Sequence, residues 1–132
     1  MTVGVDPTPC RALLEGIRAR DGDRIAACFG PGAVLRALTP HQLREEHGPE
    51  AIADRYRYWL EPLAGFEVVE ADATPIADRV RVRYWFRGRD PEKGPQENEH
   101  TAYATVESGR ISALNLSCAG FRPAGPPDGS AA

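Results

Sequence analysis

The stretch at residues 79–87 reads Arg-Val-Arg-Val-Arg-Tyr-Trp-Phe-Arg and alternates strictly between two kinds of side chain. One set of alternate positions is apolar and consists of Val80, Val82, Tyr84 and Phe86. The positions between them carry arginine or tryptophan. Because successive side chains of a β-strand point to opposite faces of a sheet, this alternation predicts a strand with one face in the core and one polar outer face.

Strand patterns continue on both sides of this stretch and predict an antiparallel meander. Before it, residues 66–73 are expected to form a strand. After it, residues 98–107 and 111–119 form two more, joined at the tight-turn dipeptide Ser108-Gly109. The C-terminal half therefore predicts four consecutive strands, each paired with the next.

The N-terminal half carries helical patterns instead. Thr8 followed by Pro9 is typical of a helix start, and Asp23 is placed to cap a second, short helix. A third helix opens at Gly48-Pro49, and a short strand at residues 33–38 precedes it. The apolar side chains of this third helix recur at helical spacing: Ile52, Tyr56, Trp59, Leu60 and Leu63. Helices early and strands late indicate an α+β fold, with three helices packed in a strongly curved, mixed but mainly antiparallel sheet.

Length and charge bound the organisation of the chain. The 132 residues fit one domain, expected over residues 8–122, after a flexible lead at 1–7 and before a disordered Pro/Gly/Ser/Ala-rich tail at 123–132. A net charge of −3 argues against nucleic acid as a partner, and the short apolar runs argue against a membrane span. Three cysteines without a C-x-x-C spacing, and no secretory signal pattern, predict a reducing cytoplasmic location.

Several short motifs, in order, resemble those of SnoaL-like proteins in the nuclear transport factor 2-like superfamily. They lie at residues 22–34, at Gly48-Pro49-Glu50-Ala51-Ile52 and at Glu107-Ser108-Gly109-Arg110-Ile111, although the Asp-Asp pair of the family's opening motif is missing here. The resemblance covers residues 8–122. It implies a cone or barrel with a deep apolar cavity, and a homodimer formed through the outer sheet face. Because superfamily members include both enzymes and non-catalytic binding modules, the fold does not decide the function.

The catalytic carboxylates of known superfamily enzymes are not found at the matching positions. The three polar residues of a ketosteroid isomerase would fall near Glu15, Ala37 and Ala102 or Thr101, and none matches. An epoxide hydrolase needs Asp and Arg facing the cavity. The inward face of the last strand offers apolar or thiol side chains there instead: Leu114, Leu116 and Cys118. We therefore expect no steroid isomerisation, and we assign these three residues to ligand contact.

Two histidines are the candidates for proton transfer. His100 shares the parity of Ala102 and Ala104 on the third long strand, which turns it inward towards the open end of the cone. A histidine there is suited to general acid or base catalysis, although it could also simply bind a loop backbone. If the parity were shifted by one residue, Tyr103 and its alternate neighbours would face inward instead.

The second histidine candidate is His47, in a polar segment at residues 41–47 with two histidines and two carboxylates. On a helix, His41 and Glu45 would share one face and could bind a divalent metal, but the segment matches no metalloenzyme motif, and we expect no metal site. A solvated loop is the simpler interpretation. If that loop borders the cavity as a lid, His47 becomes a second acid or base.

Aromatic residues complete the expected pocket. Tyr56, Trp59 and Tyr84 either fill the core or line a cavity wall, where a hydroxyl could orient a ligand. Together with the histidines, they predict a small apolar organic molecule as ligand. They also suggest cofactor-independent acid/base chemistry, such as isomerisation, cyclisation, dehydration or hydrolysis. The alternative is a non-catalytic dimeric module that binds a ligand or a protein.

The outer face of the sheet has two interpretations as well. Arg81, Arg83 and Arg87 with Trp85 are either solvated or part of a dimer interface, where arginine and tryptophan are enriched. Acidic residues on neighbouring strands are available to pair with them across strands or subunits: Glu67, Glu99 and Glu107.

Overall fold

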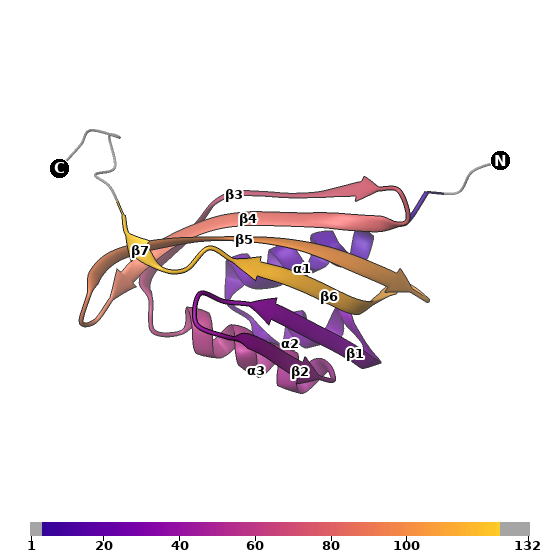
Figure 1. The fold of residues 1–132 in the computed structure, drawn as a ribbon, viewed down its shortest axis with the longest axis horizontal. Coiled ribbons are helices and arrows are strands. Elements are labelled where there is room, and N and C mark those ends of the chain that lie inside the picture. Colours follow the sequence, from indigo (N-terminus) through magenta and orange to yellow (C-terminus); the bar gives the residue numbers. More distant parts are fainter. Residues whose placement is uncertain (1–3, 125–132) are drawn as a thin grey trace.

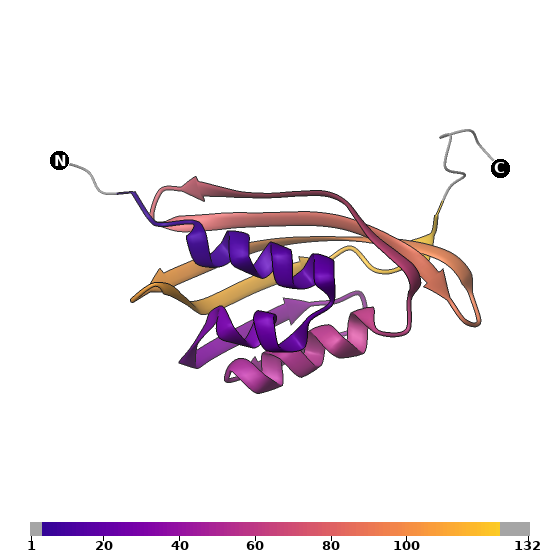
Figure 2. The same cartoon turned by 180° about the vertical axis from the view of Figure 1, so that it is seen from behind.

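Three helices cover one face of a single curved sheet in the computed structural model, which describes residues 4–124 (Figures 1 and 2). The helices are α1 (Thr8–Ala19), α2 (Gly22–Ala27) and α3 (Pro49–Leu60). The outer ends of the expected lead and tail, residues 1–3 and 125–132, lie outside the described residues. Within the described part, none of the helices is long and apolar enough for a membrane span.

Seven strands form the sheet, and their order confirms the mixed, mainly antiparallel topology. Their bounds are β1 (Phe29–Leu38), β2 (Leu43–His47), β3 (Ala64–Ile76), β4 (Arg79–Asp90), β5 (Gly94–Glu107), β6 (Arg110–Cys118) and β7 (Arg122–Pro123). The order across the sheet is β2-β1-β6-β5-β4-β3, with β7 paired to β5. Only β1 and β6 run parallel among these pairs, so the first strand lies beside the last long one (Figure 1). The sheet does not close into a barrel.

The alternation of β4 places its side chains as expected. Val80, Val82 and Phe86 are fully buried and Tyr84 is 2% exposed, so this face lies in the core. On β5, His100 is 1% exposed and Tyr103 is 46% exposed. The inward parity of His100 is therefore confirmed, and the shifted alternative is wrong. The apolar stripe of α3 packs into the same core, as its helical spacing predicts.

The segment between β1 and α3 differs from the expectation of an unstructured polar loop. Residues Leu43–His47 form β2, which pairs antiparallel with the end of β1. The turn is closed by Thr39, whose hydroxyl donates to the backbone carbonyl of Gln42 at 2.7 Å. Strand pairing here comes from backbone hydrogen bonds, which a polar sequence supplies as well as an apolar one.

Two helix caps also differ from the predicted ones. Asp21, and not Asp23, caps α2, because its Oδ1 accepts from the backbone amides of Asp23 and Arg24 at 3.1 and 3.2 Å. Thr8 is the first residue of α1 and does not cap it. Its amide and hydroxyl instead donate to Oδ1 of Asp6 at 3.0 and 2.7 Å.

Arg20 ties the ends of three elements together. It follows α1 in the left-handed conformation, with a φ of 50°. Its Nη1 donates to the carbonyls of Leu60 and Leu63 at 3.2 and 2.5 Å, just where α3 ends. The guanidinium lies 5.0 Å from the ring centroid of Phe66 on β3. One side chain thus donates to two carbonyls at the end of α3, of which that of Leu60 also accepts from the backbone amide of Leu63 at 3.2 Å.

Candidate functional site

A chain of three polar side chains crosses the core between α3 and the sheet. The hydroxyls of Tyr56 on α3 and Tyr84 on β4 are 2.8 Å apart, and the Tyr84 hydroxyl is 2.8 Å from Nδ1 of His100 on β5. Tyr84 and His100 stand directly opposite each other in the β4–β5 register. All three are buried, with exposed fractions of 0, 2 and 1%. We call Tyr56, Tyr84 and His100 the polar centre.

Aromatic rings enclose the imidazole of His100. The ring of Trp59 lies 5.1 Å away and that of Phe86 5.4 Å away, both in edge-to-face orientation. Nε2 of His100 is buried and has no hydrogen-bond partner among the described residues. A buried nitrogen without a partner is costly, so this atom is the feature of the site that most needs an explanation.

The direction of the hydrogen bonds in the polar centre follows from counting unpaired groups. If Tyr56 donates to Tyr84 and Tyr84 donates to Nδ1, only the Nε2–H of His100 lacks a partner. In the reverse direction, both the Tyr56 hydroxyl hydrogen and the Nε2 lone pair lack one. Each unpaired buried group costs about 1–3 kcal/mol, so the first direction is favoured. His100 then carries its proton on Nε2.

Burial keeps all three groups neutral. It lowers the pKa of His100 from 6.5 to about 3, because the charged imidazolium loses its hydration. Burial likewise raises the pKa of Tyr56 and of Tyr84 above its ordinary value. At neutral pH, His100 is therefore a hydrogen-bond donor through Nε2 and not a cation. This differs from the near-neutral pKa on which the expectation of a general acid or base rested.

The inner face of β5 carries further polar side chains next to the polar centre. Gln96, Asn98 and His100 occupy alternate positions and are all buried. Asn98 Nδ2 donates to Sγ of Cys118, the residue opposite His100 in the β5–β6 register. Gln96 was not among the predicted site residues, although the same alternation, continued two positions beyond Asn98, indicates its inward orientation.

The expected ligand-contact residues surround the same interior. Tyr56, Trp59 and Tyr84 are buried, and so are Leu114 and Leu116 on β6, whereas Cys118 is partly exposed. Side chains fill the space between them. Two hollows in the described part of the chain have volumes of about 370 and about 10 Å³. Tyr56 lines the smaller one, but neither is lined by His100 or Tyr84.

His47 lies away from the polar centre. Its side chain is 68% exposed and contacts Glu45 at 3.2 Å, which also accepts from Arg36 at 2.7 Å. Its neighbour Glu46 turns to the other face and binds Arg55 of α3 at 2.8 Å. His47 therefore points to the outer face of β2, away from the helices, and the structure does not bring it together with His100.

The same strand separates the two groups that a helix would have brought together. His41 precedes β2 and Glu45 lies within it, so they do not share a helical face. Within residues 4–124, no group of three or more His, Cys, Asp or Glu side chains is placed to hold a metal ion.

The outer face of the sheet carries the expected arginines. Arg83 and Glu99 form an ion pair, with 3.8 Å between Nη2 and Oε2. The guanidinium carbon of Arg87 lies over the ring of Trp85, 5.5 Å from its centroid. Several side-chain nitrogens of this face are buried without a partner among the described residues: Arg81 Nε, Trp85 Nε1 and Arg87 Nε. Tyr103 is exposed in the middle of the same face.

Three helices on one face of an open, curved, mixed sheet define the nuclear transport factor 2-like fold, the class of protein to which this architecture belongs. Within that class, the chain belongs to the SnoaL-like domain family, whose model matches residues 10–114. None of the curated protein sequences matches the chain.

Solved structures with the same fold are similar at low sequence identity. A proposed polyketide cyclase from Sinorhizobium meliloti is 22% identical, with a TM-score of 0.64, covering 84% of this chain and 94% of that one. A proposed SnoaL-like polyketide cyclase from Jannaschia sp. CCS1 is 15% identical, with a TM-score of 0.66 and 90% of each chain covered. A protein with a ketosteroid isomerase-like fold from Catenulispora acidiphila, in complex with trimethylamine, is 12% identical, with a TM-score of 0.68 and 85% of each chain covered. At these identities the likeness shows the fold alone.

Proposed function

We propose that this protein binds a small apolar organic molecule with a carbonyl oxygen, which accepts a hydrogen bond from Nε2 of His100. The observation that carries the proposal is the nitrogen Nε2 of His100, which is buried and has no hydrogen-bond partner among residues 4–124. A ligand oxygen would satisfy it. The aromatic rings of Trp59 and Phe86 around the imidazole would contact the apolar part of the same molecule.

The chemistry that suits this donor is stabilisation of negative charge on a carbonyl oxygen. Such charge develops when a carbonyl is attacked in a cyclisation, or when a neighbouring carbon loses a proton in an isomerisation. A neutral imidazole donates a hydrogen bond to this oxygen without needing to be charged, as in other enzymes that use neutral histidine as an electrophile. The Tyr56–Tyr84 chain fixes the tautomer of His100 and so holds this donor in place.

This role would suit a cyclase or an isomerase that needs no cofactor. The two proposed polyketide cyclases of the same fold support that reaction class. A ligand would enter by displacing side chains, because those that surround the polar centre now fill it. The ring of Phe121 is 42% exposed and lies 5.9 Å from the ring of Phe86, which contacts His100. We place the entrance at Phe121.

A pair of matched compounds tests the carbonyl requirement. α-Tetralone and tetralin share a bicyclic shape, but only α-tetralone has the oxygen. We expect α-tetralone to raise the melting temperature and to shift the His100 Nε2–H resonance, with weaker binding of tetralin. At 100 times its Kd a ligand adds about 2.7 kcal/mol to the free energy of unfolding, which is readily measured.

Variants distinguish binding at the polar centre from non-specific hydrophobic binding. His100→Phe should abolish the preference for α-tetralone over tetralin, and Tyr103→Phe on the outer face should leave it unchanged. Equal binding of both compounds, or binding without any change at His100, would contradict the proposal.

A second candidate function is a non-catalytic association module, as a homodimer through the outer sheet face. The filled interior favours it, and so do Trp85 and the exposed Tyr103 on that face. Sedimentation velocity tests it: we expect a dimer for the unmodified chain and a monomer for Tyr103→Lys. A monomer in both cases would contradict this candidate.

A further inference from the structure

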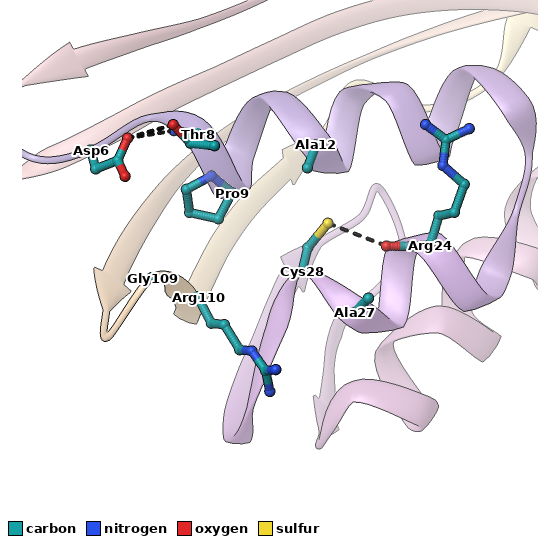
Figure 3. A pocket seen from close by; sticks show the side chains of 9 residues that line it. All are labelled: Asp6, Thr8, Pro9, Ala12, Arg24, Ala27, Cys28, Gly109 and Arg110. Atoms are coloured by element: carbon teal, nitrogen blue, oxygen red, sulfur yellow. Dashed lines mark hydrogen bonds between the residues drawn. The ribbon is translucent and has the colours of Figure 1, made fainter.

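The hollow of about 370 Å³ lies between the start of α1, the end of α2 and the turn that joins β5 to β6 (Figure 3). Its volume is about 370 Å³, within the usual range of small-molecule sites, about 300–1,000 Å³. It shares no lining residue with the polar centre. An inference about this hollow therefore does not depend on the proposed function of His100.

Apolar side chains form much of the wall of this hollow. Pro9 and Ala12 come from α1, and Ala27 and Cys28 from the end of α2 (Figure 3). The Cys28 thiol donates to the carbonyl of Arg24 at 3.3 Å, and burial raises the pKa of this thiol, so the sulfur is uncharged at neutral pH. A small hydrocarbon or aromatic group fits such a surface.

Two arginines line the hollow on either side of Cys28 (Figure 3). Neither Arg24 nor Arg110 has an ion pair or a side-chain hydrogen bond with any residue of the described part of the chain. Asp6 is the only acidic residue among those that line the hollow, and Thr8 already donates two hydrogen bonds to it. The lining therefore carries a net positive charge, and the positive end of α1, which has no acidic residue in its first turn, adds to it.

We infer that this hollow is a second binding site, for a small organic carboxylate. The apolar part of this ligand lies against Pro9, Ala12 and Cys28. The carboxylate of the ligand is bound by Arg24 and Arg110. Guanidinium groups suit this ligand because their N–H groups match the geometry of a carboxylate. Both arginines are exposed, so their side chains can turn towards the bound anion without disturbing the core.

Octanoate and 1-octanol are the probes, because they share an alkyl chain and differ in charge. Binding is measured by calorimetry and located by backbone amide NMR. We expect octanoate to shift the amide signals of the hollow, at Cys28 and Arg110 among others, and to bind more tightly than octanol. The double variant Arg24→Gln/Arg110→Gln should weaken octanoate binding at least tenfold.

Controls distinguish this site from surface charge and from the polar centre. Arg89→Gln removes an exposed arginine elsewhere and should leave octanoate binding unchanged. Amide shifts at the hollow, and not around His100, separate this site from the polar centre. Amide spectra of each variant verify the fold. The inference is overturned if octanol binds as tightly as octanoate, if the double variant binds octanoate unchanged, or if the shifts fall outside the hollow.

Discussion

Lowering the pH from 7 to 5 is expected to remove about 2 kcal/mol from the free energy of unfolding through His100 alone. The pKa of His100 is about 3 in the folded chain, against 6.5 for the ordinary side chain. Between these values the unfolded chain binds a proton that the folded chain does not, so stability falls as the pH falls from 6.5 towards 3. About 1.5 pH units at about 1.36 kcal/mol per unit give the stated loss.

Urea unfolding at pH 7, 6 and 5 measures this loss, with His100→Gln as the matched variant. Glutamine does not titrate, so the variant should lose about 2 kcal/mol less than the unmodified chain over the same range. Carboxylates with a lowered pKa, such as Asp6 and Glu45, are common to both proteins and cancel in the comparison.

Two results would refute this reasoning about His100. One is an equal loss of stability in both proteins between pH 7 and 5. The other is an imidazole NMR signal of His100 that titrates with a midpoint between pH 6 and 7. Either result would mean that the imidazole reaches water in the folded chain, and the argument for a neutral donor at Nε2 would then fail.

Three substitutions test a helix cap, a side chain that donates at the end of α3, and a close backbone approach at Gly88, each by urea unfolding. Asp21→Ala should cost about 1 kcal/mol through the lost cap of α2, whereas Asp23→Ala, 95% exposed, should cost almost nothing; equal costs would contradict the assignment of the cap. Arg20→Ala should cost about 1–3 kcal/mol, because the carbonyls of Leu60 and Leu63 lose the guanidinium as a donor. An unchanged midpoint would show that water replaces this donor fully. Gly88→Ala places a Cβ 2.7 Å from a leucine Cβ and should cost about 1–3 kcal/mol, while Gly32→Ala meets nothing within 4 Å and serves as the control.

The parts of the fold that local patterns determine could be predicted from the sequence. The faces of β4 followed from strict alternation, and the buried side of α3 followed from helical spacing. The inward orientation of His100 followed from two alanines on the same strand. In each case the side chains themselves carry the pattern, since burial selects their polarity position by position.

The parts that depend on backbone pairing were not predictable in the same way. β2 has no apolar alternation, because its inward residue Glu46 is paired with Arg55 instead of packing against apolar side chains. The direct pairing of Tyr84 with His100 depends on the register between β4 and β5, which periodicity leaves open. The orientation of His47 away from the core follows from that same unpredicted strand.

The filling of the interior was also beyond sequence patterns. Tyr56 and Trp59 have the same spacing whether they line a cavity or close it. The outcome depends on how their rings meet those of Phe86 and His100 in three dimensions. The hydrogen bonds between Tyr56, Tyr84 and His100 join three elements that are distant in sequence, so no local motif predicts them.

The parallel pairing of β1 with β6 means that the sheet cannot be completed until the last long strand has been synthesised. β1 leaves the ribosome early, but its neighbour is the last long strand, so one edge of β1 stays without a partner until Arg110–Cys118 has been made. An open strand edge is prone to pair with other chains. We therefore expect that the N-terminal half does not fold as an independent unit. A chain that ends before β6 should aggregate and should not form a smaller version of the domain.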